Sequence, residues 1–587
     1  MVKERLEKLK KAMKNSGVDV YYFNTSDYHM SEYVPEHFKT IAYYSGFTGS
    51  LATLLVSADK AVIFVDGRYH VQADKECLKN GVEVVKLGTE NALSPIDYLK
   101  TYFAGKTIGL DGKRTSISFA KQLLSNNLKI KSVDIYSSLI EDRAPLRKDP
   151  IYELDLKYTG LSRKRKIELI SHVLNGNTHI VNNLESIAYL LNLRSDDIKY
   201  TPVFMAYLVI HKSKVYLFVD EKRLNDTLLY ELYDDEVIVR DYDAYYEFLD
   251  TISNSNILLD ENKVNYETYL HLDNKHNHFV NKLSVIEEMK AIKNNTEQKN
   301  MRMAHIYDGV ALVRFLRWLE SVDKTNISEY DVANTIDYFR KEYKANDLSF
   351  SSIVAYNENA AQMHYSAKKL TAAKLDNKGI LLFDTGGQYD EGTTDVTRTV
   401  ALGEVDVEVK KYFTLVLKSM FNLSEVKFMQ GLNGNQLDIL ARKDLWELGV
   451  DYRCGTGHGV GYNLSVHEGP PNVRYGHNGN GTEMYEIKPG MIFSDEPGVY
   501  FEGKFGIRCE NLLLCKKDIK NEYGQFLSFE HLTLCPFDLN LIDKNYLDQK
   551  TIDALNNYHK KVYETLCPYL DEEEQAFLKE KTREIWN

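Results

Sequence analysis

The hydrophobic pattern at the start of the chain alternates between helix and strand periodicities. Leu6, Leu9 and Met13 recur at helical spacing among charged residues, which predicts a surface helix that ends at Gly17. Short apolar runs bounded by turn residues predict buried strands. These strands lie at residues 18–23, 61–66 and 108–111, with a further helix at 91–104. The alternation is typical of an α/β layer with its strands inside.

A second region repeats features of the first. It follows a linker predicted at 144–150, which contains two prolines, and it opens with a basic helix over 163–174. Its apolar runs VYLFVD and ILLDEN, at 215–220 and 257–262, resemble the earlier AVIFVD and IGLDGK in the same order. This order indicates a duplicated α/β unit, and independent convergence on buried strands is the alternative.

The pattern changes again near residue 290. Asn295 and Gln298 predict a capping box at the start of a long helix. One face of this helix is predicted by Leu312, Phe315, Leu316 and Leu319. Antiparallel strand signals rich in Gly, His, Asp and Glu follow. The last stretch, 546–585, predicts charged helices that pack either on their own domain or on a partner.

The length of 587 residues predicts several domains, because one hydrophobic core seldom organises more than about 250–300 residues. We place an N-terminal α/β domain at 1–146, a related α/β domain at 147–289 and a third domain at 290–587.

Charge and cysteine content narrow the choice of partners and compartment. The net charge of −12, from 73 Lys and Arg against 85 Asp and Glu, argues against nucleic acid as a partner. No apolar run approaches the ~20 residues of a membrane span, so no membrane is expected. The six cysteines form no CxxC pair, which favours free thiols in a reducing compartment and predicts a cytoplasmic protein.

Acidic residues and histidines gather in one part of the third domain. Asp384 ends an apolar strand and Asp395 begins a Thr-rich one, so a hairpin would place both carboxylates on adjacent strands. Two close carboxylates repel unless a cation lies between them, although Asp is also common as a turn cap. His458 lies in a Gly-rich loop, which lets the backbone approach an ion or a substrate.

Two glutamates complete this group. Glu496 lies in SDEPGVY, and Glu510 lies with Arg508 on a strand whose neighbours are apolar, where charges are costly unless they are paired or bind metal. Four carboxylates and one imidazole suit two divalent ions, and oxygen ligands favour manganese. The predicted ligands are Asp384, Asp395, His458, Glu496 and Glu510.

The ordered motifs DTGGQYDEGTTDVTRT, GTGHGVG, HEGP, DEPG and GIRCEN resemble those of the pita-bread metallopeptidases. The three-domain cytosolic Xaa-Pro aminopeptidases (aminopeptidase P) are the most similar group, and the resemblance spans nearly the whole chain. It implies two creatinase-N-like α/β domains followed by an α+β pita-bread catalytic domain. The implied reaction is metal-dependent hydrolysis that releases the N-terminal residue of a peptide with proline in second position.

The resemblance also implies roles for individual residues. Asp395 and Glu510 would bridge two ions, His458 and Glu496 would complete one, and Asp384 the other. A bridging water or hydroxide would be the nucleophile, and Glu496 would take its proton. The remaining roles concern substrate and support: His364 and His467 would bind the scissile carbonyl and the tetrahedral intermediate, Arg508 would orient a ligating carboxylate, and Tyr500 would assist.

One position departs from the family pattern. Similar enzymes usually carry a histidine four residues before the metal-binding histidine, where it helps to wall the proline pocket, and here Cys454 takes that place. A thiol is smaller and donates hydrogen bonds weakly, so the pocket is expected to be wider or less selective. No Cys, His and Asn order typical of thiol proteases accompanies Cys454, so it is not expected to be a nucleophile.

Two alternative functions remain at this point. A prolidase would cleave only Xaa-Pro dipeptides, but the additional middle domain favours the aminopeptidase. A non-enzymatic binding protein of the same fold would usually have lost its ligands, which are intact here. The resemblance further implies a homodimer, for which residues 546–585 offer an apolar helical face.

Overall fold

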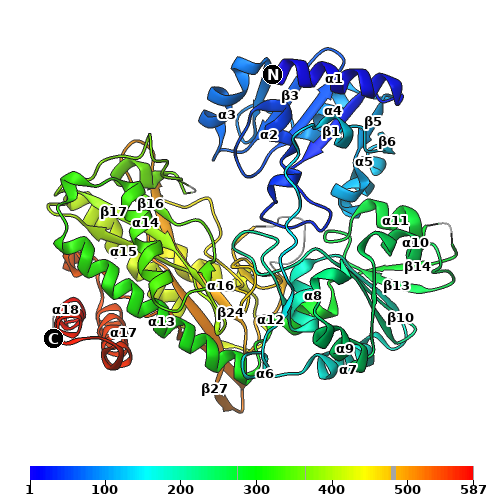
Figure 1. Ribbon diagram of the computed structural model, residues 1–587. Coiled ribbons are helices and arrows are strands. Elements are labelled where there is room, and N and C mark those ends of the chain that lie inside the picture. Colours follow the sequence, from blue (N-terminus) through cyan, green and yellow to red (C-terminus); the bar gives the residue numbers. More distant parts are fainter. Residues whose placement is uncertain (274, 364, 477–483, 586–587) are drawn as a thin grey trace. The chain divides into compact units, whose positions relative to one another are not determined.

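The computed structural model describes residues 1–273, 275–363, 365–476 and 484–585 (Figure 1). Contacts within the chain define two compact units. The first comprises Met1–Leu154 and Leu161–Ile286, and the second comprises Asp155–Gly160 and the chain from Glu287 onward. Apart from residues 155–160 and 287–289, both predicted N-terminal domains therefore lie in the first unit, and the boundary between them remains a prediction.

The first unit contains two six-stranded sheets with the same strand order, β4-β3-β2-β1-β5-β6 and β12-β11-β10-β8-β13-β14. The strands of the first sheet are β1 (Val20–Asn24), β2 (Thr53–Ser57), β3 (Ala61–Val65), β4 (Val82–Lys86), β5 (Thr107–Leu110) and β6 (Lys129–Ser132). Those of the second are β8 (Thr178–Val181), β10 (Tyr207–His211), β11 (Lys214–Phe218), β12 (Val237–Arg240), β13 (Asn256–Leu259) and β14 (His278–Asn281). The small strands β7 (Tyr152–Glu153) and β9 (Leu193–Arg194) pair separately.

The pairing directions of the two sheets also agree. The strand β1 runs antiparallel to β2 and parallel to β5, and β8 runs antiparallel to β10 and parallel to β13. The similar sequences at 61–66 and 215–220 form the equivalent strands β3 and β11, and the other similar pair forms β5 and β13. The predicted duplication is thus confirmed strand by strand.

Burial on both faces explains why central strands such as β1 and β3 are mostly apolar. In β1, Val20 and Tyr22 join one hydrophobic cluster and Tyr21 and Phe23 join another, as the alternation of side chains across a strand requires. The helices of the first unit are α1 (Val2–Asn15), α2 (Thr40–Ser45), α3 (His70–Cys77), α4 (Pro95–Tyr102), α5 (Ile117–Ser125), α7 (Arg163–Leu174), α8 (Leu184–Leu191), α9 (Asp226–Asp234), α10 (Tyr245–Leu249) and α11 (Tyr266–Leu272). The predicted face of α1, formed by Leu6, Leu9 and Met13, is buried.

The second unit is built on antiparallel strand pairs, as predicted for its fold class. Its longer strands lie in the sheets β16-β17-β20 and β21-β28-β27-β24, and short strands form β15-β18-β19, β22-β23 and β25-β26. Their bounds are β15 (Asp347–Leu348), β16 (Ile353–Tyr356), β17 (Ile380–Thr385), β18 (Gly387–Tyr389), β19 (Gly392–Thr393), β20 (Val396–Ala401), β21 (Phe428–Met429), β22 (Gly457–His458), β23 (Asn472–Val473), β24 (Ile492–Asp495), β25 (Gly498–Phe501), β26 (Phe505–Arg508), β27 (Asn511–Asn521) and β28 (Gly524–His531).

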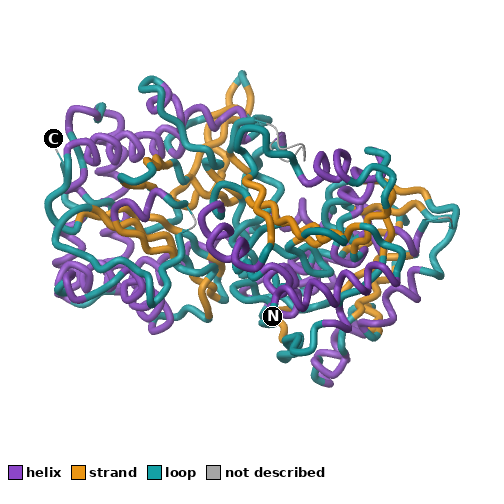
Figure 2. The backbone as a smooth tube through the Cα atoms, turned by 90° about the horizontal axis from the view of Figure 1, so that it is seen from above, coloured by secondary structure: helices purple, strands orange, loops and turns teal. Residues whose placement is uncertain are grey.

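Helices accompany these strands, and Figure 2 shows the strands in orange among helices in purple. The helices are α6 (Leu156–Thr159), α12 (Val285–Ala291, which crosses the boundary between the units), α13 (Asn295–Ser321), α14 (Glu329–Glu342), α15 (Val407–Ser424), α16 (Gly434–Trp446), α17 (Gln549–Leu566) and α18 (Glu572–Lys581). The capping box of α13 is formed by Asn294 and Glu297, not by Asn295 and Gln298. The side chain of Asn294 also donates to the carbonyl oxygen of Thr159 at 2.8 Å, and this contact helps to fix the helix start one residue earlier.

The C-terminal helix α17 packs within its own unit. Its predicted apolar face, from Ile552 through Leu555 and Tyr558 to Val562, is buried in the same hydrophobic cluster as Phe413. Because the apolar face is buried inside its own unit, it needs no partner subunit to cover it. The expected homodimer therefore rests on the family resemblance alone.

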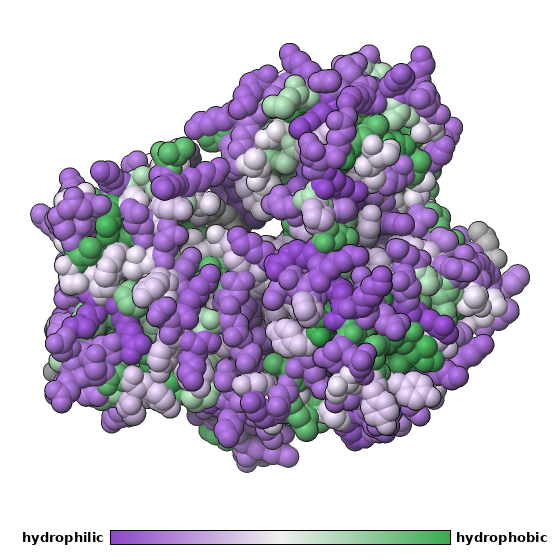
Figure 3. All heavy atoms as spheres, viewed as in Figure 1, coloured by the Kyte–Doolittle hydropathy of each residue, from purple (hydrophilic) through white to green (hydrophobic). Residues whose placement is uncertain are grey.

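The surface drawn in Figure 3 is covered mainly by hydrophilic side chains, with hydrophobic ones in small groups. Among the described residues, no helix combines the length and the apolar character that crossing a membrane requires.

Candidate metal centre

The first two predicted ligands lie where β17 and β20 pair. The register places Asp384 opposite Thr397, and Asp395 directly precedes β20. The expected simple hairpin is interrupted, because the chain between the two strands forms β18 and β19 in another sheet. Gly386 permits this close crossing, since a Cβ atom there would lie 2.0 Å from the backbone oxygen of Thr394.

The other three predicted ligands come from the edges of neighbouring strands. His458 ends β22, Glu496 follows β24, and Glu510 lies in the break between β26 and β27 rather than on a strand as expected. The pairing of Asp495 with Asn511 in β24 and β27 brings Glu496 and Glu510 to the same end of that sheet. The backbone beside His458 can lie close to β24 because the preceding residue is Gly457.

A Cβ atom at Gly457 would lie 1.9 Å from the backbone oxygen of Ser494, so only glycine fits that position. The loop that carries His458 is therefore held tightly against β24.

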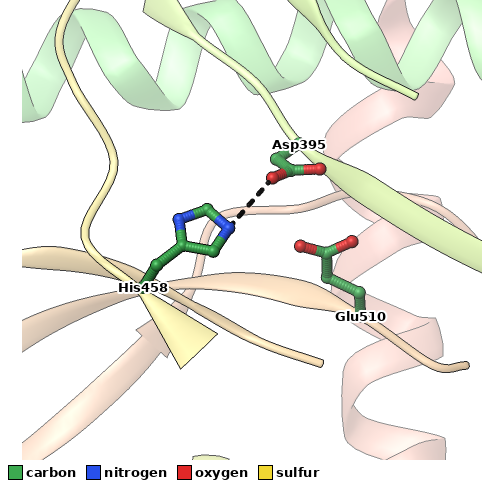
Figure 4. Close-up of side chains that lie close together, drawn as sticks. All are labelled: Asp395, His458 and Glu510. Atoms are coloured by element: carbon green, nitrogen blue, oxygen red, sulfur yellow. Dashed lines mark ion pairs between the residues drawn. The ribbon is translucent and has the colours of Figure 1, made fainter. Parts of the chain in front are cut away.

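Three of the predicted ligands converge on one point, as Figure 4 shows. Asp395, His458 and Glu510 each offer a ligand atom, and these atoms all lie within 4.8 Å of one another. The Nε2 atom of His458 lies 3.5 Å from Asp395 Oδ2 and 3.3 Å from Glu496 Oε1. Three of the other four predicted ligands, Asp395, Glu496 and Glu510, thus lie around this imidazole, and the fourth, Asp384, is held by Arg508.

In two carboxylates, one oxygen is bound by the protein and the other is not. Asp384 Oδ2 accepts from Arg508 Nη2 at 2.5 Å, and Glu510 Oε2 accepts from the Thr397 hydroxyl at 2.7 Å. Asp384 Oδ1 and Glu510 Oε1 are buried without a hydrogen-bond partner among the described residues. Buried oxygens without donors are costly unless a cation binds them, so this donor set fits divalent metal ions.

Burial dominates the electrostatics of three carboxylates. It raises the pKa of Asp384 to about 6, an effect that Arg508 opposes and Asp395 supports. Burial also raises the pKa of Asp395, and it holds the pKa of Glu510 well above its usual range, assisted by the nearby carboxylates. The site therefore holds more negative charge than its basic groups can neutralise, a deficit that divalent cations would offset.

The pKa values of His458 and Glu496 reflect their mutual contact. Burial opposes the charged imidazole, but Asp395 and Glu496 hold the pKa of His458 well above its usual range. Burial also opposes the charged form of Glu496, yet His458 and Arg508 outweigh it, so the pKa of Glu496 is lowered. Glu496 is therefore ionised at neutral pH.

Arg508 contacts residues on several strands of the site. Its Nη1 donates to the Tyr500 hydroxyl at 2.7 Å, and its Nε donates to the Thr397 hydroxyl at 3.0 Å. With the contact to Asp384, this guanidinium spans both strands of the interrupted hairpin and the β25-β26 pair. Its contact fixes one oxygen of the Asp384 carboxylate, which is the geometry that its predicted orienting role requires.

One of the two histidines predicted to bind substrate, His467, lies beside the metal ligand His458. The rings of His467 and His458 meet edge to face, with centroids 4.3 Å apart. His364 lies outside the described residues. Cys454 is partly buried, and burial, supported by Glu496, raises the pKa of its thiol to about 11. Cys454 is therefore a neutral thiol at neutral pH, which fits its expected lack of a nucleophilic role.

Sequence reasoning missed two hydroxyl groups at the site. Thr397 lies between Glu510 and Arg508, as described above. Ser494 donates to Glu496 Oε1 at 2.9 Å and accepts from the backbone N–H of His458 at 3.0 Å. The signal was available, because Thr397 and Ser494 each lie two residues from a predicted ligand and so share its strand face.

Comparison with known proteins agrees with this site and fold. Residues 299–517 match the model of metallopeptidase family M24, and 525–585 match its C-terminal region. Residues 5–143 and 142–297 match two models of the creatinase/prolidase N-terminal domain. These matches together extend over nearly the whole chain.

Full-length relatives are found among fungal proteins. A probable Xaa-Pro aminopeptidase P of Laccaria bicolor is 36% identical over 597 residues, which cover 98% of this chain and 92% of that protein. Another, from Coprinopsis cinerea, is 35% identical over 99% of this chain and 98% of its own length. The crystal structure of X-prolyl aminopeptidase from Caenorhabditis elegans, described as a cytosolic enzyme with a di-nuclear active site, matches with a TM-score of 0.92, 29% identity and full coverage of both chains.

The fold and the convergent carboxylates thus define a metallopeptidase. Given relatives that are more than one-third identical over nearly its whole length, the chain belongs to metallopeptidase family M24.

Proposed function

We propose that this protein is a metal-dependent Xaa-Pro aminopeptidase, which releases the N-terminal residue from peptides whose second residue is proline. The observation that carries the proposal is the convergence of Asp395, His458 and Glu510 in a chain whose relatives with this name match it from end to end. Proline lacks the amide proton and fixes its own φ, so this bond requires a dedicated site.

The ligands of two divalent cations would be Asp384, Asp395, His458, Glu496 and Glu510. When bound, the cations would neutralise the clustered carboxylates and lower the pKa of water at the site. The oxygen-rich donor set favours manganese. Asp384 and Glu510 support this assignment because each offers a buried oxygen without a hydrogen-bond partner among the described residues.

The remaining chemistry is assigned to side chains of the site. Glu496 is ionised and can accept a proton from the attacking water and pass it toward the leaving nitrogen. His467, beside His458, is assigned to the scissile carbonyl and the developing oxyanion, together with His364. Arg508 holds Asp384 in place, and Tyr500 receives a hydrogen bond from Arg508 at the edge of the site.

Three further properties belong to the proposal. The protein acts in the cytoplasm, forms a homodimer, and comprises domains at 1–146, 147–289 and 290–587. The first is supported by the family resemblance and by the free cysteines, and the second by the family resemblance alone. The third is supported by the family models, which change at residues 142–143 and 297–299.

Metal-stripped protein should be assayed with Xaa-Pro dipeptides, longer Xaa-Pro peptides and Xaa-Ala controls, each with Mn²⁺, Co²⁺ or Zn²⁺ added. We expect no hydrolysis without metal and hydrolysis of the longer Xaa-Pro peptides with Mn²⁺. Cleavage of dipeptides alone would instead identify a prolidase. Metal binding without turnover of any peptide would indicate a binding protein.

Asp395→Ala provides the matched control for this assay, because it removes a ligand from the described cluster. It should abolish turnover while the circular dichroism spectrum stays unchanged.

A further inference from the structure

A group of buried charges lies directly behind the loop that carries His467. The carboxylate of the next residue, Glu468, receives Lys290 Nζ on Oε2 at 2.8 Å and Lys293 Nζ on Oε1 at 2.5 Å. The three side chains are only 1–3% exposed. Glu287, also buried, lies 3.4 Å from Lys290 Nζ, so two acidic and two basic side chains balance one another.

The lysines are themselves held in place. Lys290 lies in α12, and Lys293 lies in the short connection between α12 and α13. The backbone N–H of Lys293 donates to the carbonyl oxygen of Gly490 at 2.9 Å, and its own carbonyl oxygen accepts from Gln298 Nε2 at 2.7 Å. A lysine on each oxygen fixes both the position and the rotation of the Glu468 carboxylate.

The backbone of Glu468 is tied to the metal-binding loop. Its N–H donates to the carbonyl oxygen of Gly459 at 2.8 Å, and the N–H of Gly459 donates to Pro471 at 2.9 Å. Gly459 directly follows His458, so the loops of His458 and His467 form one hydrogen-bonded unit. A movement of Glu468 would therefore shift His467 relative to His458.

Buried charges of this kind seldom increase stability, since apolar side chains of similar volume often serve as well. Their fixed geometry points to another purpose. We propose that Lys290 and Lys293 act through Glu468 as positioning residues, which set His467 against His458 in the metal centre. This inference rests on the role proposed above for His467 as the partner of the scissile carbonyl.

A double-mutant cycle with Lys293→Met and His467→Ala tests the proposal. Lys293→Met should lower kcat about 10-fold or more while KM and metal content stay near wild type, because only the transition-state contact is lost. His467→Ala should lower kcat ~10²-fold. If the lysine acts through His467, the double variant should be no slower than His467→Ala alone.

Two further variants separate positioning from loss of fold. Lys166→Met removes another buried lysine, in the first unit, which donates to the carbonyl oxygen of Tyr189, and it should leave kcat unchanged. If Lys293→Met fails to fold, Lys293→Met/Glu468→Gln removes both charges together and takes its place in the cycle.

The outcomes distinguish the two proposals. A wild-type kcat for His467→Ala would overturn the role of His467 and, with it, this inference. Slow turnover by His467→Ala combined with a wild-type kcat for Lys293→Met would overturn only the inference. Fully multiplicative losses in the double variant would do the same, since they would mean that the lysine acts independently of His467.

Discussion

Replacing Thr397 by valine should weaken metal binding although Thr397 is not a ligand. Its hydroxyl donates to Glu510 Oε2 at 2.7 Å and accepts from Arg508 Nε at 3.0 Å, and Thr397 itself is fully buried. A hydrogen bond to a charged group contributes about 1.5–3 kcal/mol. Because valine has nearly the same shape as threonine, packing should be preserved. The lost hydrogen bond should therefore affect mainly the orientation of the Glu510 carboxylate. We therefore expect metal affinity to fall about 10–100-fold.

Isothermal titration of the metal-stripped protein with Mn²⁺ measures this change directly. Thr414→Val is the matched control, because Thr414 is equally buried in α15 and its hydroxyl donates to the carbonyl oxygen of Lys410 at 2.8 Å. The control should lose stability on urea unfolding but retain its metal affinity.

An unchanged affinity for Thr397→Val would refute the reasoning that the protein orients Glu510 through this hydroxyl. A loss of affinity in Thr414→Val as large as that in Thr397→Val would refute it as well, since the effect would then follow from destabilisation alone.

Three other predictions concern specificity, pH dependence and assembly. Cys454→His should sharpen discrimination between Xaa-Pro and Xaa-Ala peptides, by at most the ~1–3 kcal/mol of a pocket contact, and an unchanged kcat/KM ratio would assign the pocket to other residues. Burial lowers the pKa of His179 to about 4. Between about pH 6.5 and 4 the unfolded chain therefore binds more protons than the folded one. The free energy of unfolding should fall by up to ~3 kcal/mol as the pH is lowered through that range. Urea unfolding of His179→Asn should show a flatter pH dependence, and an equally steep one would contradict this cause. Light scattering should give about twice 67.7 kDa, and a mass near 67.7 kDa at micromolar concentration would refute the homodimer while leaving the catalytic site unaffected.

Periodicity predicted the α/β layers because the central strands are buried on both faces, and the two pairs of similar apolar runs indicated the duplication. Such strands are mostly apolar, as β1 and β3 are, and their signal does not depend on distant contacts. The helix α1 was predicted for a similar local reason, since one face lies on the core and the other on solvent.

Features set by distant contacts were not predictable in this way. Asn294 and Asn295 both begin a possible capping box, and the additional contact of Asn294 with Thr159 comes from a segment far away in sequence. The course of the chain from β17 through β18 and β19 depends on Gly386 fitting against Thr394, which no local pattern reveals. The hydrogen bonds of Thr397 to Glu510 and Arg508 likewise depend on the folded chain, because both partners are more than 100 residues away in sequence.

The proposed metal ligands could be picked out from the sequence because clustered buried carboxylates are costly without metal. Asp384, Asp395, Glu496 and Glu510 are four carboxylates in one buried region. Arg508 and a protonated His458 together supply only two positive charges, and the pKa of three of the acids is raised by burial. Protons and cations must therefore compete for the same oxygens, and divalent cations would offset the negative charge that these two basic groups leave. In Asp384 and in Glu510, one carboxylate oxygen accepts a hydrogen bond and the other has no hydrogen-bond partner among the described residues. This arrangement is suited to holding metal ions rather than protons.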